Sequence, residues 1–348
     1  MQHPRTAASG HPSTDGPSAD AHSIDGPTLA RALIAAADAL GAQADAINAI
    51  NVFPVPDGDT GTNMWMTMRA AADEVAIASD PRAAVVAKAA AQGALMGAKG
   101  NSGVILSQIL AGFAAFPAVE ATLDAEAIAG ALERARDAAY HVVSQPREGT
   151  ILTAISAAAT AARAYDGARA DEALAAAVEA AHDAVARTPE LLPVLKEAGV
   201  VDSGAQGLYV MLDGMLRGVR GESTRTSHDD LGAIDTSWLA ATQQAHAHGE
   251  TSGYCTEFVV SGDALSAETV RERLRALGDS LLVVGGGDLL RVHLHTHAPD
   301  EALAYARSIG AVSREKIDDM SAQFANLAAR DDPRRAATSA PIAAVAVV

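Results

Sequence analysis

Asp57 and Asp59 stand two residues apart in the segment NVFPVPDGDTGTNM, residues 51–64. Two carboxylates at this spacing can supply hard oxygen ligands to Mg²⁺ and leave coordination positions for phosphate oxygens and water. The next three residues, TGT at 60–62, offer backbone N–H groups and hydroxyls with little bulk, which suits the close approach of a triphosphate. The pattern therefore indicates binding of a magnesium–nucleotide complex. The same DGD is also compatible with a turn that only caps the next helix.

Three later segments resemble this loop in composition and position. They are GAKGNSG at 97–103, QPREGT at 145–150 and VVDSGAQG at 200–207, and each stands directly before a predicted helix. The first turn of a helix has free N–H groups and the positive end of the helix dipole, both of which attract anions. If these helix ends converge with the aspartate loop, we expect them to form one phosphate-binding rim.

Several other functional classes are excluded by what the sequence lacks. There is no G-x-x-x-x-G-K-[ST] loop, no kinase H-R-D constellation, no G-x-S-x-G elbow and no H-E-x-x-H motif. The formal net charge is −17 and no basic run occurs, so we expect no nucleic-acid partner. No run reaches the roughly 18 apolar residues of a membrane span, so we expect no integral membrane segment.

A second candidate site lies further along the chain. His293, His295 and His297 alternate on a predicted strand and would face one side of a sheet. Two such imidazoles could bind one zinc ion, with Cys255 on another strand as third ligand. The alternative is a small buried cysteine and a His-rich edge strand without metal. Glu257 is either a partner of this site or a solvated strand position.

The elements that must position these residues are mostly helices. Hydrophobic residues make up 49% of the 348 residues but aromatics only 3%, which favours a core of Ala, Val, Leu and Ile between closely packed helices. Apolar periodicity and the loops between its segments predict about eight helices. Their expected ranges are 28–49, 63–78, 82–96, 103–114, 124–143, 151–165, 170–187 and 204–218.

The periodicity changes beyond a polar linker. A strand at 253–262, a helix at 266–278, a hairpin at 280–297 and a helix at 299–310 predict a small α+β domain. The chain then ends in the apolar run PIAAVAVV, which we expect to begin a further domain. The predicted divisions are a disordered tail at 1–26, a helical domain at 27–220, a linker at 221–234, an α+β domain at 235–330 and a second linker with the start of that further domain at 331–348.

Four segments in this order resemble bacterial fatty acid kinase, whose N-terminal domain is similar to the ATP-binding subunit of dihydroxyacetone kinase. They are INVFPVPDGDTGTNM, GAKGNSGVILSQ, REGTILT and VVDSGAQGL, and the resemblance covers residues from about 28 to 218. GYCTEF at 253–258 and RVHLHTHAP at 291–299 extend it through the middle domain of that family. The resemblance implies an eight-helix antiparallel barrel that binds ATP in a cup at one end.

The resemblance also implies roles for particular residues. Asp57 and Asp59 would bind two Mg²⁺ ions that bridge the phosphates, and Asn51 occupies the position where dihydroxyacetone kinase relatives carry a third aspartate. Contacts to the phosphates or metals, or the nucleotide site more generally, are implied for Thr60, Gly61, Thr62, Asn63, Gly100, Asn101, Ser102, Gly103, Thr150 and Asp202. Thr62 would join the two aspartates in catalysis. For Thr62, Asn63 and Ser102, simple helix capping remains the alternative.

In the middle domain the resemblance implies that Cys255, His293 and His295 bind zinc and that His297 does not. The implied reaction transfers the γ-phosphate of ATP to the carboxylate of a fatty acid held by a separate carrier protein, giving an acyl phosphate. One alternative is a glycerone-type kinase subunit that phosphorylates a small hydroxyl substrate, and another is a nucleotide- and zinc-binding regulatory fragment without turnover. We further expect a homodimer, as in the family, and a cytoplasmic location, because the single cysteine allows no intrachain disulfide.

Overall fold

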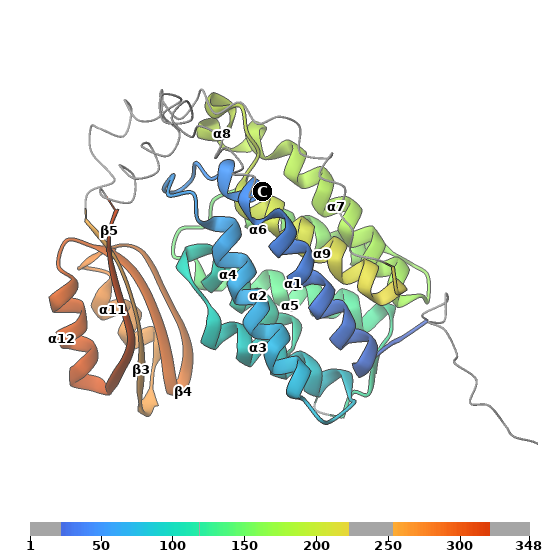
Figure 1. Ribbon diagram of the computed structural model, residues 1–348, viewed down its shortest axis with the longest axis horizontal. Helices are drawn as coiled ribbons and strands as arrows, with labels where there is room; N and C mark the ends of the chain where they lie inside the picture. The colour runs from blue at the N-terminus through green and yellow to red at the C-terminus, as the bar shows by residue number, and fades with distance from the viewer. Residues whose placement is uncertain (1–21, 118, 223–252, 321–348) are drawn as a thin grey trace, which may run out of the picture.

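The computed structural model describes residues 22–117, 119–222 and 253–320 (Figure 1). Two parts of the chain are visible in it, a helical domain and a smaller domain built on a sheet. The predicted second linker and further domain at 331–348 lie outside the described residues, as do nearly all of the predicted linker at 221–234 and both ends of the predicted α+β domain, 235–252 and 321–330.

The helical domain is a closed ring of helices. Its helices are α1 (Gly26–Ala49), α2 (Thr60–Ile77), α3 (Ala83–Gly97), α4 (Gly100–Phe113), α5 (Ala125–Val142), α6 (Ile151–Ala164), α7 (Ala170–Leu191), α8 (Pro193–Ala198) and α9 (Ser203–Arg220). Each long helix packs on the next along the chain, α7 packs on α9, and α9 packs on α1, so the ring closes (Figure 1). With the sheet domain that follows, this confirms the predicted mainly helical barrel and small α+β domain.

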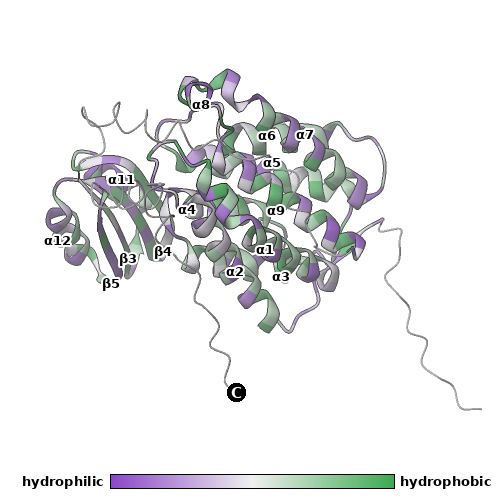
Figure 2. Ribbon diagram, turned by 45° about the horizontal axis from the view of Figure 1, so that its top comes forward, coloured by the Kyte–Doolittle hydropathy of each residue, from purple (hydrophilic) through white to green (hydrophobic). Residues whose placement is uncertain are grey.

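Small residues explain how the ring closes. The core consists largely of alanine with Leu, Ile, Val and Met, and two glycines of α9 face α1. A side chain at Gly214 would meet the backbone of Ala36, and one at Gly218 would meet the backbone of Ala32. Close approach of this kind replaces the bulky aromatic contacts that the composition lacks. Figure 2 shows hydrophobic and hydrophilic residues alternating along the same helices, as expected where one face of each is buried.

The helix boundaries differ from the predicted ones at the places that matter for the site. α2 begins at Thr60 and α4 at Gly100, each three residues earlier than predicted, so residues expected in loops lie in first helical turns. The predicted tail at 1–26 is too long, because Ile24 is buried in the core and pairs with Leu123 in the short sheet of β1 (Ile24–Asp25) and β2 (Thr122–Leu123). The six-residue helix α8 was not predicted.

The sheet domain has three antiparallel strands in the order β4–β3–β5. Its elements are β3 (Tyr254–Leu265), α11 (Ala267–Leu274), β4 (Gly278–Thr296), α12 (Pro299–Ile309) and β5 (Ala311–Asp319). Within β4 the chain doubles back as the predicted hairpin requires: a side chain at Gly278 would collide with the backbone of His295, and φ is positive at Gly285 and Gly287. β5 was not predicted.

The two faces of this sheet have different neighbours. Phe258 and Val260 of β3 belong to a core shared with α11 and α12, which cover one face (Figure 1). Because side chains alternate along a strand, Cys255 and Glu257 point to the opposite face, toward the helical domain. On the side that meets the helical domain, Leu282 and Val284 of β4 pack with Ala98, Val104 and Val142.

Polar contacts add to this interface between the domains. The Met96 carbonyl, near the end of α3, accepts hydrogen bonds from Arg291 and from Arg314. The Gly100 N–H, at the start of α4, donates to Glu257 at 2.7 Å. The middle domain therefore holds the segment between α3 and α4 from both sides.

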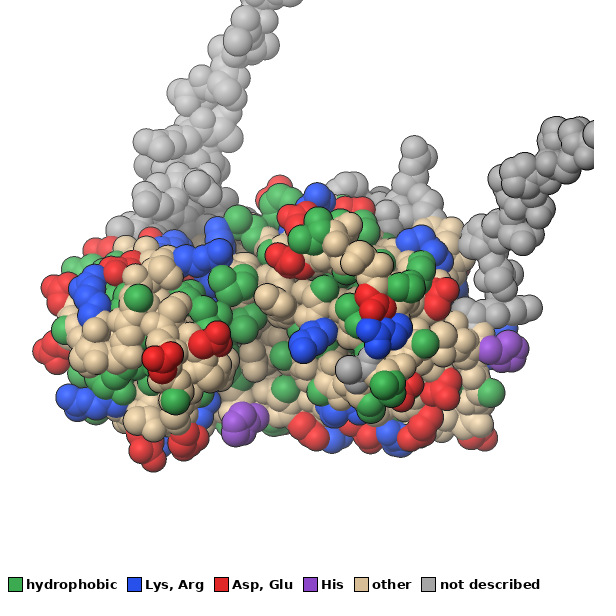
Figure 3. Space-filling view, turned by 90° about the horizontal axis from the view of Figure 1, so that it is seen from below, with side chains coloured by type: hydrophobic (Ala, Val, Ile, Leu, Met, Phe, Trp, Pro, Cys, Tyr) green, Lys and Arg blue, Asp and Glu red, His purple; other side chains and the backbone are tan. Residues whose placement is uncertain are grey.

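The surface carries charges of both signs. The face in Figure 3 shows acidic and basic side chains interspersed, with no continuous positive area over either domain. Within the described ranges, no helix combines the length and apolar character that crossing a membrane requires.

Candidate active site between the helical domain and the sheet

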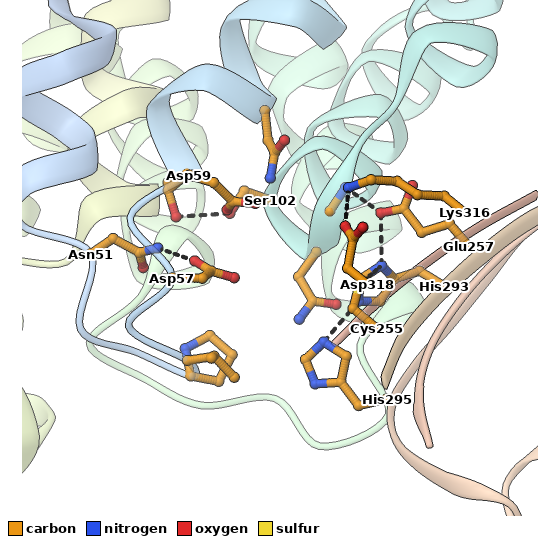
Figure 4. Close-up of a pocket in the computed structure, with 16 residues that line it drawn as sticks. Asn51, Asp57, Asp59, Ser102, Cys255, Glu257, His293, His295, Lys316 and Asp318 are labelled. Carbon is orange, nitrogen blue, oxygen red and sulfur yellow. Dashed lines mark hydrogen bonds and ion pairs between the residues drawn. The ribbon is translucent and has the colours of Figure 1, made fainter. Parts of the chain in front are cut away.

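A pocket opens where the end of the helical ring meets the bare face of the sheet (Figure 4). The helical wall is formed by Asn51, Pro54, Val55, Asp57, Asp59, Thr60, Asn63, Gly100, Asn101 and Ser102. The sheet wall is formed by Cys255, Glu257, His293, His295, Lys316 and Asp318. The aspartate loop and the Cys/His cluster, predicted as two separate sites, therefore face each other across one pocket.

The aspartate loop is held by side-chain hydrogen bonds. Asn51 Nδ2 donates to Asp57 Oδ1 at 2.6 Å, and Ser203 Oγ donates to Asn51 Oδ1 at 3.4 Å. The amide oxygen of Asn51 is thus turned toward α9 and its NH₂ toward Asp57, so Asn51 supports an aspartate in this structure. Its role as a third metal ligand stays a prediction.

The two aspartates destabilise each other's charge. Burial, together with the charge and hydrogen bond of neighbouring Asp59, raises the pKa of Asp57 to about 8. Asn51 opposes this shift with its hydrogen bond, but one neutral amide does not cancel the burial and the neighbouring carboxylate. A site of this kind favours either a shared proton or a cation bound between the two carboxylates.

The helix ends beside the aspartates lack side-chain caps. Asp59 precedes α2 and Lys99 precedes α4, and neither side chain hydrogen-bonds to the N–H groups of its helix. Thr60 Oγ1 and Ser102 Oγ lie 3.4 Å apart and join the two first turns. The capping alternative therefore does not describe Asp59, and the first turns of α2 and α4 present polar groups to the pocket.

The other two predicted helix ends are capped and lie behind this wall. Thr150 caps α6, and Asp202 caps α9 by accepting from Ala205 N at 2.7 Å. The buried Asp202 carboxylate also accepts from the backbone of Ile151 and Gly204, which joins the starts of α6 and α9, and burial raises its pKa to about 7. Neither Thr150 nor Asp202 lines the pocket, so their predicted nucleotide contacts stay predictions.

Thr62 lies on the opposite side of its helix from the pocket. Its backbone N–H donates to Asn48 Oδ1 at 3.1 Å, and its hydroxyl accepts from Asn48 Nδ2 at 2.9 Å. Gly61 packs against the carbonyl of Ala44 and Gly103 against the hydroxyl of Thr67, so these two predicted contacts also face other helices. The structure thus gives Thr62 a packing partner on α1, and its catalytic role remains a prediction.

The Cys/His cluster has the dimensions of a metal site. The candidate ligand atoms of Cys255, His293 and His295 all lie within 4.8 Å of one another, and the two Nε2 atoms of the histidines are 3.3 Å apart. Tetrahedral zinc with usual bond lengths separates its nitrogen ligands by roughly 3.3 Å. Burial and the charge of His293 lower the pKa of His295 to about 3, so His295 is a neutral ligand at pH 7. His297 follows the end of β4 and is exposed, in agreement with its exclusion from the predicted site.

Glu257 connects this cluster to the helical domain. Oε1 lies 3.1 Å from His293 Nδ1 and accepts from the Gly100 N–H, while Oε2 lies 3.4 Å from Arg291. Burial alone would raise the pKa of Glu257, but His293, Gly100 and Arg291 lower it to about 2. An ionised Glu257 that accepts the Nδ1 proton leaves His293 Nε2 directed at the metal position.

Lys316 and Asp318 were missed by sequence reasoning, and Glu257 was left with two open interpretations. Lys316 and Asp318 lie on β5, opposite Glu257 and Cys255 of β3 respectively. The segment AVSREKIDD carries almost no apolar pattern, and most of its side chains are exposed, so nothing marked it as a strand. A signal was present in the alternation of Lys316 and Asp318, but only the strand pairing gives it meaning.

The fold and the site together define a two-domain protein with a helical nucleotide-type cup, and the sequence comparisons agree. Residues 54–217 match the DAK2 domain family. Residues 251–327 match the family of FakA-like middle domains of fatty acid kinase. Together these matches support a kinase-related protein of the group that includes the dihydroxyacetone and fatty acid kinases.

Longer relatives match nearly the whole of this chain. The chain is 39% identical over 319 residues to protein YloV of Bacillus subtilis, covering 88% of this chain and 58% of YloV. It is 34% identical over 319 residues to a Staphylococcus saprophyticus protein, covering 86% of this chain and 56% of that protein. This chain therefore spans little more than half the length of these relatives. Among solved structures, the dihydroxyacetone kinase from C. freundii in complex with AMP-PNP and Mg²⁺ is 21% identical, with a TM-score of 0.39, over 62% of this chain and 38% of that one.

Proposed function

We propose that this protein is an ATP- and Mg²⁺-dependent kinase that phosphorylates the carboxylate of a fatty acid held by a separate carrier protein, giving an acyl phosphate. The observation that carries the proposal is the juxtaposition of Asp57 and Asp59 with the uncapped starts of α2 and α4 on one pocket wall. Carboxylates for metal and helix ends for phosphate are the parts that a triphosphate site requires. The middle-domain match supports the choice of a fatty acid kinase system.

The residues present fit magnesium. Asp57 and Asp59 provide only oxygen donors, and the raised pKa of Asp57 shows that their charges are poorly compensated by the protein. Asp57 and Asp59 would hold the ion, with Asn51 keeping Asp57 in place by its hydrogen bond. When bound, Mg²⁺ neutralises phosphate charge and fixes the phosphates in position.

The remaining chemistry requires positioning more than proton transfer. A fatty acid carboxylate is ionised at neutral pH, so no general base is needed to create the nucleophile. The first turns of α2 and α4, with Thr60, Asn63 and Ser102, would hold the phosphates in line with the incoming carboxylate. The pocket needs no room for an acyl chain, because the carrier protein would enclose it.

The Cys/His cluster fits zinc as the second metal. Cys255, His293 and His295 supply one sulfur and two nitrogens, and Glu257 orients His293. Three protein ligands leave a fourth position, which in this structure would open toward the pocket that holds the aspartates. Bound zinc would place a Lewis acid beside the phosphate groups.

Product chemistry tests the proposed function. The chain would be incubated with Mg-ATP, a fatty acid and a purified fatty-acid-binding carrier, and hydroxylamine would be added. Hydroxylamine converts an acyl phosphate to a hydroxamate but leaves the phosphate ester of a hydroxyl untouched. Carrier-dependent hydroxamate supports the proposal. A stable phosphate ester of a small hydroxyl compound would favour a glycerone-type kinase, and nucleotide binding without any product would favour a regulatory fragment.

A further inference from the structure

Lys316 is the only Lys or Arg among the described residues that line the pocket. It lies on β5, directly across from Glu257 of β3, and its side chain is half exposed. In Figure 4 its ammonium lies on the sheet wall, among the groups that face the helical wall with Asp57 and Asp59. A cation is thus available to whatever occupies the space between the walls.

The charges around the pocket call for such a cation. Four carboxylates line it, from Asp57, Asp59, Glu257 and Asp318. Glu257 is already engaged by Gly100, His293 and Arg291. On the helical wall, phosphate groups would be met by metal ions and helix N–H groups. Among the described side chains of the sheet wall, and apart from a bound metal, only Lys316 can offer a lysine or arginine charge to a phosphoryl oxygen.

The position of Lys316 is set by its own strand. Asp318, two residues on and on the same face of β5, forms an ion pair with the Lys316 ammonium. Asp318 stands opposite Cys255, so the pair lies alongside the Cys/His cluster and not at the outer rim of the sheet. A single carboxylate uses part of the ammonium's capacity, because the group has three N–H donors.

We propose that Lys316 is a catalytic residue of the phosphoryl transfer, in which its ammonium contacts a non-bridging oxygen of the γ-phosphoryl group while Asp318 positions it. The inference rests on the proposed function. The acceptor carboxylate oxygen forms a bond to the γ-phosphorus as the bond between that phosphorus and the β,γ-bridging oxygen breaks. The electron pair leaves with ADP, no proton is transferred, and Lys316 stays protonated throughout. Its charge stabilises the transferring group most strongly when that group is between donor and acceptor.

A purely structural role makes different predictions. If Lys316 only neutralises Glu257 and Asp318, its loss would disturb the sheet wall and the contact between the domains. Ground-state nucleotide affinity, metal content and hydrogen exchange of residues 97–103 would then change together. A catalytic role predicts that these three properties stay close to those of the parent chain while turnover falls.

The test compares Lys316→Met, Lys316→Arg and the control Lys88→Met, an exposed lysine on α3. For Lys316→Met we expect kcat to fall by about 10²- to 10³-fold, the range seen when one stabilising donor is removed from an active site, with KM for ATP nearly unchanged. Lys316→Arg, which keeps the charge, should recover part of the loss. An unchanged kcat, or a loss matched by lost zinc and faster exchange at 97–103, would overturn the proposal.

A binding measurement separates this proposal from the choice of acceptor. Mg-ADP with aluminium fluoride imitates a phosphoryl group in transfer and requires no fatty acid or carrier. Lys316→Met should weaken binding of this complex by roughly 30-fold or more and leave Mg-ADP alone within about threefold, because the contact belongs to the transferring group. If the parent chain makes no acyl phosphate yet shows this difference, the proposed acceptor is wrong and the role of Lys316 stands. Equal effects on both ligands, or no effect, would refute it.

Discussion

The two walls of the pocket use different ligands and reach them by different routes. On the helical wall, Asp57 and Asp59 are neighbours in sequence, offer only oxygen, and stand at the start of a helix. On the sheet wall, Cys255 and the two histidines offer sulfur and nitrogen and meet through strand pairing, with Cys255 opposite His295 and Glu257 opposite His293. Oxygen donors suit magnesium, and the sulfur–nitrogen set suits zinc.

This difference shows how one pocket can keep two metals apart. The aspartates keep some contact with solvent and leave coordination positions open, which suits an ion that arrives with its nucleotide. The histidines are buried, and Glu257 holds one of them in orientation, which suits an ion that stays with the protein. Glu257 also accepts the Gly100 N–H of the helical wall, so one carboxylate joins the two halves.

The strongest test of the comparison removes the helical wall's metal ligand. Asp57→Ala should lower Mg²⁺-dependent turnover by on the order of 10³-fold or more, because the nucleotide would lose the ion that fixes and neutralises its phosphates. The helical fold should persist, since Asp57 lies in a loop and contributes no apolar packing. Steady-state kinetics and circular dichroism measure the two properties.

Asp38→Ala is the matched control, because Asp38 is exposed on α1 and outside the pocket. It should leave turnover unchanged. Zinc content should be the same in Asp57→Ala as in the parent chain if the walls bind their metals independently. Normal turnover in Asp57→Ala would remove the magnesium assignment.

The next test removes a ligand from the sheet wall. Cys255→Ser replaces a thiolate by a poorer zinc ligand and should weaken zinc binding by about 10- to 100-fold. Metal content after dialysis against a competing chelator reports the change. Binding of Mg-ADP should fall much less, because the aspartates and helix ends are untouched. Full zinc occupancy in Cys255→Ser would show that the cluster is a set of buried side chains and not a metal site.

A third test breaks the residue that joins the walls. Glu257→Gln keeps the shape of the side chain but loses the charge that faces Arg291 and His293. We expect zinc binding to weaken by roughly tenfold and the Gly100 amide to exchange its hydrogen faster. Mass spectrometry of deuterium uptake over residues 97–103 measures the exchange. Glu268→Gln is the control, because Glu268 is exposed on α11. Unchanged exchange at 97–103 would mean that Glu257 does not couple the walls.

The sequence predicted the two walls unequally, for physical reasons. The aspartate loop and the helix starts are local features, so composition and spacing were sufficient to find them and the fold that carries them. The Cys/His cluster required the register of two strands, and spacing alone left it open. Lys316 lies on an edge strand with exposed, charged residues, which is how such strands are protected from pairing with other chains. That protection also removes the apolar alternation by which a strand is recognised.

The smallest expected effect is a pH dependence that should appear on one wall only. Burial and Asp59 raise the pKa of Asp57 to about 8, so at pH 7 a proton occupies the place that Mg²⁺ must take. Mg²⁺ affinity should therefore increase with pH, by at most about tenfold per pH unit, and level off above pH 8. Titration calorimetry in buffers of different ionisation enthalpy should find close to one proton released per Mg²⁺ at pH 7 and almost none above about pH 9. No proton release at pH 7 would show that Asp57 is already ionised, and the two walls would then differ in their donor atoms but not in how protons compete with their metals.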